Sequence, residues 1–249
     1  MAYKEYELCI APEPDLVIWR YMSLQKFKLM IKNKTLFFCR ADKFSDPFEG
    51  TIPKKEVEYR IKSFDDTETN ESISNLHRKL KGHFLVNCWH VNNEENDAMW
   101  RLYLKNNNGV AIKTTVSKLL DSLINSEEEV NCSLIRYIDF EKDIWRPPTV
   151  KGYNMFTPIL HKRKEFSHEN ELRLIHQLDF QNGDIEEYWR KQPKRKGKDI
   201  QVDLTKLINV ICTAPTSNGM HISKIKDIVQ KNGFDFHVEK SKLDNEPYY

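Results

Sequence analysis

The sequence predicts an α+β protein, in which mixed and mainly antiparallel sheets are flanked by helices in one domain spanning residues 1–249. Many short strand-like segments follow one another without the regular long helices that a doubly wound parallel sheet requires. No internal repeat or low-complexity tract divides the chain. Charged residues make up 31% and hydrophobic residues 39%, which is typical of a soluble globular protein able to bury a core.

The N-terminal third begins with a strand, a helix and a second strand. The segment DLVIWRY, residues 15–21, has strand character, and Ser23 after it is a good N-cap. Four apolar residues then share one helical face: Leu24, Phe27, Met30 and Ile31. TLFFCRA, residues 35–41, is the second strand, and the turn-rich loop DKFSDPFEG follows it.

A polar insertion is expected at about 54–82, helical at both ends and mobile between them. Strand character returns at 83–90, and Asn96 is a plausible cap for a short helix at 97–104. Residues 107–109 form a tight turn before a strand at 110–114.

The second half is predicted from the same kinds of signal. A helix is expected at about 116–125, a strand at 132–140, a chain break at Pro147-Pro148 and a strand from Glu169 to Ile175. A basic loop at about 189–199 leads to a strand at 208–214. The tail contributes a helix with Ile222, Ile225, Ile228 and Val229 on one stripe, a C-terminal cap at Asn232-Gly233, and a last strand at 234–240.

Composition and charge exclude several classes of protein. The net charge of +2 provides no global field toward nucleic acid or membrane, and no apolar run is long enough to cross a bilayer. The N-terminus lacks the features of a secretory signal, so we expect a cytoplasmic protein without a membrane partner. The five cysteines are scattered and best explained as reduced, mostly buried thiols. The histidines show no metal-ligand spacing, so no metal is expected.

The most informative segment is FSHENELRLI, residues 166–175. Strand geometry would place Glu169, Glu171 and Arg173 on one face and Leu172 and Leu174 on the other. The polar face would then present two carboxylates and a guanidinium on rigid backbone, as a binding or catalytic site requires. The alternative is an ordinary half-solvated strand in which Glu171 and Arg173 make a weak surface pair.

Two further segments contain candidate ligand-binding residues. In RADKFSDPFEG, aromatic residues alternate with Arg40, Asp46 and Glu49, which suggests a lid or pocket wall with Arg40 free to bind phosphate. The alternative is a structural loop whose carboxylates cap helices. In CWHVNNEENDAMWRLY, Trp89 and Tyr103 could stack on a planar base, whereas Trp100 fits core packing better.

Basic residues precede the Glu169 strand and recur near residue 190. His161 and Lys162 belong to a cationic run that would suit an anionic substrate, although a solvated helix end has the same composition. The run WRKQPKRKGK, residues 189–198, could contact a nucleic-acid backbone but more often is a solvated surface loop. The dinucleotide-binding, phosphate-binding-loop and nucleophile-elbow motifs are all missing from the sequence.

Several of these segments resemble a bacterial family named as domain of unknown function 2971. The resemblance rests on WRYMSLQKF, LFFCRADKFSDPFEG, CWHVNNEENDAMWRLY, GVAIKTT, the YIDF strand and HKRKEFSHENELRLI. It covers most of the chain from about Leu16 to His176. The combination of ADKFxDPFEG with FxxExExR is specific for the family, but it implies no activity.

A second resemblance implies chemistry. An early strand with an arginine and a late strand with ExE is the order found in arginine–serine–glutamate ADP-ribosyltransferases. That family would place Arg20, with Tyr21 beside it, against the phosphates or ribose of NAD. Glu171 would be the catalytic glutamate that stabilises the oxocarbenium-like transition state, and Glu169 would orient the acceptor. The Ser-Thr-Ser-like middle strand of that family has only Thr114-Thr115 as a counterpart.

The leading hypothesis is therefore an NAD- or nucleotide-using enzyme, a transferase or NAD glycohydrolase, with NAD as co-substrate and a protein or nucleic acid as acceptor. Bacterial proteins with this activity are often toxins or phage-defence effectors. One alternative is a non-catalytic nucleotide- or nucleic-acid-binding module. Another is a metal-dependent nuclease using Asp42, Asp46, Glu49 and Glu171 around magnesium. The oligomeric state stays open.

Overall fold

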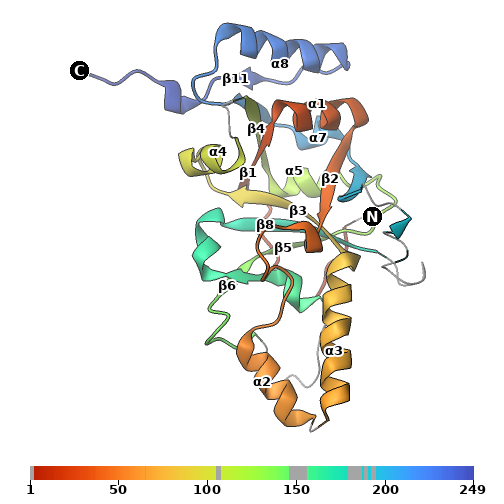
Figure 1. Cartoon of the computed structure of the whole chain (residues 1–249). Coiled ribbons are helices and arrows are strands. Elements are labelled where there is room, and N and C mark those ends of the chain that lie inside the picture. Colours follow the sequence, from red (N-terminus) through yellow and green to blue (C-terminus); the bar gives the residue numbers. More distant parts are fainter. Residues whose placement is uncertain are drawn as a thin grey trace.

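The protein is an α+β structure built around one large, mostly antiparallel sheet (Figure 1). The computed structural model describes residues 3–64, 66–104, 108–145, 156–178, 187, 190–191 and 195–249. The predicted break at Pro147-Pro148 and much of the predicted basic loop lie outside these residues.

Nine of the described strands belong to the main sheet. Seven are ordered β11-β10-β4-β1-β3-β2-β9, and β8 joins the other edge of β3 and carries β5. Their bounds are β1 Val17–Ser23, β2 Thr35–Arg40, β3 Phe84–Val91, β4 Gly109–Thr115, β5 Asn131–Leu134, β8 Glu171–Gln177, β9 Gly197–Gln201, β10 Val210–Thr213 and β11 Val238–Glu239. Among these nine strands only β10 and β11 pair in parallel, so the predicted mixed and mainly antiparallel sheet is confirmed.

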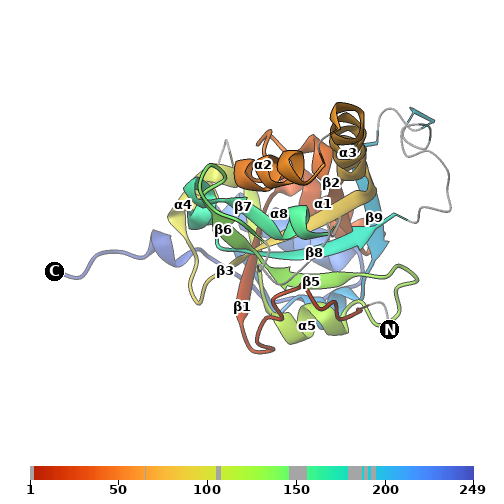
Figure 2. The same ribbon diagram turned by 90° about the horizontal axis from the view of Figure 1, so that it is seen from below.

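A small parallel pair lies beside β8. It consists of β6 Arg136–Ile138 and β7 His161–Arg163. A 3-10 helix, η4 Lys164–Glu169, connects β7 to β8 (Figure 2). This pair matters for the site, because it places Lys162 and the end of η4 beneath the start of β8.

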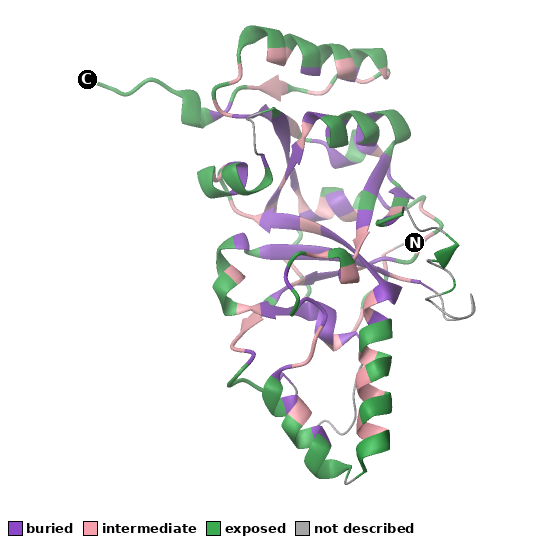
Figure 3. Ribbon diagram, in the orientation of Figure 1, coloured by how far each residue is buried: buried purple, intermediate pink, exposed green. Residues whose placement is uncertain are grey.

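Helices cover the sheet and extend beyond it. Their bounds are α1 Leu24–Asn33, α2 Lys54–Ser63, α3 Thr67–Leu80, α4 Asp97–Tyr103, α5 Val116–Asp121, α7 Leu204–Leu207 and α8 Gly219–Lys231. The helices α2 and α3 form a hairpin that projects from the body (Figure 1). They are largely exposed, whereas the strands are mostly buried (Figure 3).

Several predicted elements are confirmed with their physical causes. Ser23 caps α1, whose buried residues are Leu24, Phe27, Met30 and Ile31, as expected. Asn96 caps α4 through the amides of Ala98 and Met99. At the end of α8, Asn232 is the C-cap and Gly233 adopts a φ of 80°, which glycine tolerates best.

Other predictions were wrong in extent. The insertion was expected to be helical only at its two ends, but α3 already begins at Thr67, because Asp66 accepts hydrogen bonds from the amides of Glu68 and Thr69. The helix expected at 116–125 ends at Asp121. The strand expected at 132–140 is divided between β5 and β6, because these two segments pair with different strands.

The central strand β3 has an uncommon arrangement of neighbours. Along one edge, β8 pairs with it from Phe84 to His90. On the other edge, β2 pairs with its beginning at Leu85 and Val86, and β1 with its end at His90 and Val91. Between these two contacts, residues 87–89 have no strand partner on that edge among the described strands. The sheet is therefore split between β1 and β2.

Candidate functional site

A cavity of about 710 Å³ lies over this split in the sheet. Its walls come from α1, the ends of β1 and β2, α4, the segment after β2, and η4. Four partly exposed apolar side chains lie along it: Leu29, Phe37, Leu102 and Tyr103. A volume of this size, with mostly apolar walls and a few buried charges, is typical of a small-molecule site.

Arg20 closes the split from the side of β1. Its guanidinium donates to the carbonyl oxygens of Cys88 at 3.2 Å and Phe37 at 3.4 Å. Asn87 donates to the same Phe37 carbonyl at 3.0 Å. These side chains satisfy carbonyl groups where the two strands diverge, as buried backbone requires. Arg20 thus has a structural role and also lines the cavity.

At one end of the cavity, five buried charged side chains form a single network. Glu171, at the start of β8, receives Lys162 Nζ on Oε1 at 2.9 Å and Arg173 Nε on Oε2 at 2.7 Å. Lys162 Nζ also lies 2.6 Å from Glu169 Oε2. Arg173 donates twice to Glu49, at 2.5 and 3.1 Å, and once to the carbonyl of Ile159. Three carboxyl groups therefore share two cations.

The two carboxyls that face the cavity, Glu169 and Glu171, have pKa values shifted in opposite directions. Burial and the adjacent Glu171 carboxylate raise the pKa of Glu169 to about 7, although Lys162 opposes the change. Burial works in the same direction on Glu171, but Arg173 and Lys162 outweigh it and hold the pKa of Glu171 well below its usual range. One carboxyl is thus ionised at neutral pH while its neighbour exchanges a proton there. Such divided pairs are common where acid–base chemistry occurs.

The backbone around Glu171 is held by two further groups. The Tyr137 hydroxyl accepts the amide hydrogen of Glu171 at 2.8 Å. His90 Nδ1 lies 2.7 Å from the Glu169 carbonyl, so this nitrogen must carry the proton it donates. Burial lowers the pKa of His90, which keeps the ring neutral.

A second charge pair borders the same end of the cavity. Asp46 accepts two hydrogen bonds from the Arg163 guanidinium, at 3.2 and 2.8 Å. That guanidinium also lies over the rings of Phe48 and Phe166, 4.6 and 5.2 Å from their centres. The segment after β2 is thereby attached to β7 and η4, and its residues Asp46 and Glu49 form part of the cavity wall.

Most of the predicted site residues converge on the cavity. Those lining it are Arg20, Tyr21, Asp46, Glu49, Trp89, Tyr103, Lys162, Glu169 and Glu171. Arg173 lies directly beneath Glu171 and is fully buried. Leu172 and Leu174 belong to the main core, so the predicted two faces of this strand are confirmed, and the weak surface pair is ruled out by burial.

Two predicted residues lie elsewhere. Arg40 is bound to Asp42 through two hydrogen bonds of 2.8 and 2.7 Å and does not line the cavity, so it is not free for phosphate. His161 is buried, contacts the Thr157 carbonyl at 2.9 Å and packs against Trp145. His161 points away from the cavity because side chains alternate along β7, so that Lys162 faces the carboxylates and His161 the opposite side.

Two other predictions need correction. Glu169 is not part of the strand: it ends η4, and Asn170 after it adopts a φ of 38°, so β8 starts only at Glu171. Trp89, expected to stack on a planar base, is 1% exposed, because β3 is covered on both faces and the indole ring packs into the main core. Trp100 is core, as expected.

The sequence reasoning missed several residues of the site. Tyr137, Cys88, His90 and Phe166 surround the carboxylates, but none was a predicted site residue. All four lie in segments that carry the family resemblance: Tyr137 in YIDF, Cys88 and His90 in CWHVNNEENDAMWRLY, and Phe166 in HKRKEFSHENELRLI. The contacts themselves are long-range and have no local sequence pattern.

The described residues contain no group of three or more histidine, cysteine or acidic side chains placed to hold a metal ion. The four carboxylates considered for magnesium are instead bound to cations: Asp42 to Arg40, Asp46 to Arg163, Glu49 to Arg173, and Glu171 to Arg173 and Lys162. None of the described helices combines the length and apolar character needed to span a membrane.

Comparison with protein families identifies one related domain. Residues 99–174 match the family described as "Protein of unknown function (DUF2971)". The matched segment runs from α4 to β8 and includes Lys162, Glu169, Glu171 and Arg173. The N-terminal motifs that also resembled this family lie before it. Comparison with curated proteins gave no match, and comparison with solved structures gave none either.

Proposed function

We propose that this protein is an ADP-ribosyltransferase-like enzyme that breaks the N-glycosidic bond of NAD or a related nucleotide at the cavity over the split sheet. The observation that carries the proposal is Glu171. Its carboxylate is 4% exposed, lines the cavity and is kept ionised by Lys162 and Arg173. A fixed negative charge in a low-dielectric site is what an oxocarbenium-like transition state needs.

The rest of the cavity suits a nucleotide. Arg20 keeps hydrogen-bond donors in reserve, because a guanidinium has five N–H groups and two of its nitrogens contact carbonyls. Tyr103 and Phe37 offer partly exposed aromatic faces for a planar ring. These features lie on the same cavity as the carboxylates, so a ligand with a base, a sugar and phosphates can contact all of them.

In the proposed reaction, the bond between ribose C1′ and the ring nitrogen breaks, and its electron pair goes to the leaving ring. That ring leaves as neutral nicotinamide, and positive charge develops on the ribose beside Glu171. An acceptor hydroxyl, amine or water then forms a bond to C1′. Its proton passes to the Glu169 carboxylate, whose pKa of about 7 suits a base at neutral pH.

The direct test is nicotinamide release from NAD by the purified protein. We expect release by wild type and a loss of about 1000-fold in Glu171→Gln, by analogy with the removal of one electrostatic contact at other active sites. Glu165→Gln is the matched control, because Glu165 is exposed on η4 and does not line the cavity. Release by Glu171→Gln at the wild-type rate would remove Glu171 from the mechanism.

The pH dependence provides a second test of the same reaction. Glu169 acts as a base only when ionised, so kcat/KM should rise as pH increases through about 7 and then level off. Glu169→Gln should lose this rise. EDTA should leave the activity unchanged, whereas a magnesium-dependent nuclease would be inactivated by it.

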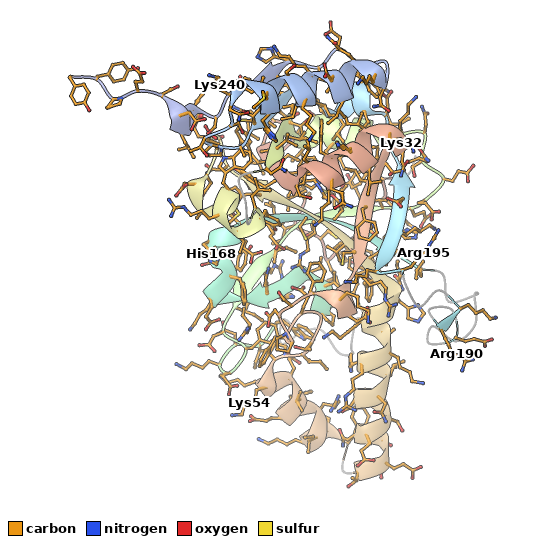
Figure 4. The ribbon with its side chains drawn as sticks, turned by 45° about the horizontal axis from the view of Figure 1, so that its top comes forward. Lys32, Lys54, His168, Arg190, Arg195 and Lys240 are labelled. Carbon is orange, nitrogen blue, oxygen red and sulfur yellow. The ribbon has the colours of Figure 1, made fainter. Side chains whose placement is uncertain are left out.

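One observation favours a second candidate, a module that binds nucleic acid. The exposed face of α1 carries Lys26, Lys28 and Lys32, and the helix contains no acidic residue. Arg195 and Lys196 are exposed at the start of β9. In Figure 4, Lys32 and Arg195 lie on the same side of the molecule. Within the described part of the chain, none of these five cations has a carboxylate within 4 Å.

Nucleic-acid binding at this face has a clear signature. Affinity for a labelled single strand should fall steeply between 50 and 200 mM salt, on the order of tenfold or more. Lys28→Glu with Lys32→Glu should weaken it, while Lys55→Glu with Lys62→Glu on α2 should not. Binding that is unaffected by the α1 changes would exclude this face as the contact surface.

A further inference from the structure

Lys162 occupies a position that its assignment as a substrate-binding cation does not explain. It is 6% exposed, and its ammonium group lies between two carboxylates, 2.6 Å from Glu169 Oε2 and 2.9 Å from Glu171 Oε1. The ring centre of Phe166 lies 4.9 Å from the same nitrogen. A buried ammonium in such contacts is committed to the protein and has little surface to offer an anionic ligand.

The contacts of Arg173 show why Lys162 is needed. Arg173 makes two hydrogen bonds to Glu49 and one to Glu171, and it gives a further one to the Ile159 carbonyl. Its guanidinium has no contact with Glu169. Of the described cations, only Lys162 contacts both Glu169 and Glu171. Without it, two carboxyls would face each other in a buried site with one cation on one side.

The position of Lys162 on the β6–β7 pair also indicates that it holds the two carboxyls in place. It is the central residue of β7, which pairs in parallel with β6 through Tyr137. The Tyr137 hydroxyl in turn accepts the Glu171 amide. Glu169 ends η4, directly after β7. The small β6–β7 pair thus fixes the ammonium, one carboxyl and the backbone of the other carboxyl together.

We propose that Lys162 is a positioning residue, which holds Glu169 and Glu171 side by side on one shared ammonium, so that Arg173, which contacts only Glu171 of the two, gives the ionised role to Glu171 and leaves the proton-carrying role to Glu169. The effect of Lys162 on catalysis rests on the proposed function. Its effect on the protonation of the two carboxyl groups does not. Because Arg173 reinforces Glu171 alone, sharing one ammonium leaves Glu169 as the weaker acid.

Other titratable or charged groups surround this pair and belong to the same balance. They are Arg20 on β1, Cys88 and His90 on β3, Tyr103 on α4, Tyr137 on β6, His168 on η4, and Asp46 and Glu49 in the segment after β2. None of these residues is substituted in the variants below, so the changes are confined to Lys162, its two partners and the control.

The test follows the carboxyl groups directly, by 13C NMR of protein labelled at the glutamate side-chain carboxyl carbon, with Glu169→Gln to assign the signal. We expect one carboxyl to titrate near 7 in wild type. In Lys162→Met this signal should move up by at least one pH unit, and Lys162→Arg should restore it. Lys164→Met is the matched control, because Lys164 is exposed and contacts Asp139 instead.

A second variant keeps the test decisive if Lys162→Met does not fold. In Glu171→Gln the ammonium has only Glu169 as a charged partner, so the Glu169 titration should fall by at least one unit. A Glu169 signal that stays near 7 in Glu171→Gln would show that burial alone sets it, with no contribution from the neighbouring carboxylate or from the shared ammonium, and would overturn the proposal. An unshifted signal in folded Lys162→Met would overturn the proposal equally.

The NMR titration tests the role of Lys162, and the nicotinamide assay tests the proposed reaction, so either can be contradicted without the other. If wild type releases no nicotinamide but the titrations shift as expected, the proposed reaction is wrong and the role of Lys162 stands. If NAD is consumed, Lys162→Met should lower kcat at least tenfold, leave KM within about threefold and move the pH profile upward. Recovery of the profile by Lys162→Arg separates positioning from a merely structural contribution.

Discussion

Two glutamates of this protein accept hydrogen bonds on both carboxylate oxygens, but from different kinds of donor. Glu95 attaches the C-terminal segment to α4. Its Oε1 accepts the amides of Lys242 and Leu243, and its Oε2 accepts Trp100 Nε1 at 3.0 Å and the Ser241 hydroxyl at 2.7 Å. Every one of these donors is a neutral group.

Glu171 is held by cations instead, and those cations are shared. Lys162 also contacts Glu169, and Arg173 also contacts Glu49. Neutral donors satisfy a carboxylate without creating a further charge to balance. Shared cations couple several protonation states, so a change at one carboxyl is felt at the others. The comparison teaches that the number of hydrogen bonds to a carboxylate does not decide whether its protonation is coupled to that of its neighbours, whereas the charge of its donors does.

The largest expected effect tests the charged network. Arg173→Met removes a guanidinium that is 0% exposed and leaves Glu49 and Glu171 without their common cation. We expect the free energy of unfolding to fall by about 3–5 kcal/mol, as when one partner of a buried ion pair is removed. Urea denaturation measures it. Arg101→Met, at an exposed pair with Asp97, should have little effect.

The second-largest expected effect is a pH dependence of stability, which the charged network around Glu171 should show and the neutral contacts of Glu95 should not. The raised pKa of Glu169, about 7 against a usual 4.5, stabilises the fold below about pH 4.5, and this stabilisation is lost as pH rises through 7. Glu169→Gln should therefore gain up to about 2 kcal/mol relative to wild type between pH 4.5 and 8, after allowance for solvent screening. Thermal unfolding across this range is the measurement, and a constant difference between the two proteins would contradict it.

The smallest effect tests the neutral region. Glu95→Ala leaves Trp100 Nε1 and the Ser241 hydroxyl without their acceptor, which should cost about 1–2 kcal/mol. The loss should be local, with faster hydrogen exchange at the amides of Lys242 and Leu243 and unchanged titration of Glu169. Glu94→Ala is the control, because Glu94 is exposed and contacts only the Lys242 side chain. A shifted Glu169 titration in Glu95→Ala would break the distinction between the two regions.

The sequence was sufficient where local rules decide the structure. Ser23 and Asn96 are N-cap residues that predict the starts of α1 and α4. The alternation of Leu172 and Leu174 with Glu171 and Arg173 predicts the two faces of β8. These features depend on neighbours within a few residues, so a single sequence carries them.

The sequence was insufficient where contacts between distant segments determine the structure. The basic composition before residue 199 concealed β9, which exists because it pairs with β2, and a Cβ at Gly197 would lie 1.9 Å from the Phe38 carbonyl oxygen. The proximity of Glu49, Lys162 and Arg173 likewise arises from the packing of three separate segments. Arg40 was expected to be free for phosphate in a lid or pocket wall, but the conformation of the loop places its guanidinium against Asp42.

The split between β1 and β2 has a mechanical consequence. Over residues 87–89 the sheet is closed on that edge by the side chains of Arg20 and Asn87 rather than by a backbone ladder. Side chains can lengthen or exchange their contacts by rotation, whereas paired strands separate only by breaking their hydrogen bonds together. The sheet beneath the cavity can therefore widen at this one place without losing a strand pair, because only the side chains of Arg20 and Asn87 bridge the described strands there.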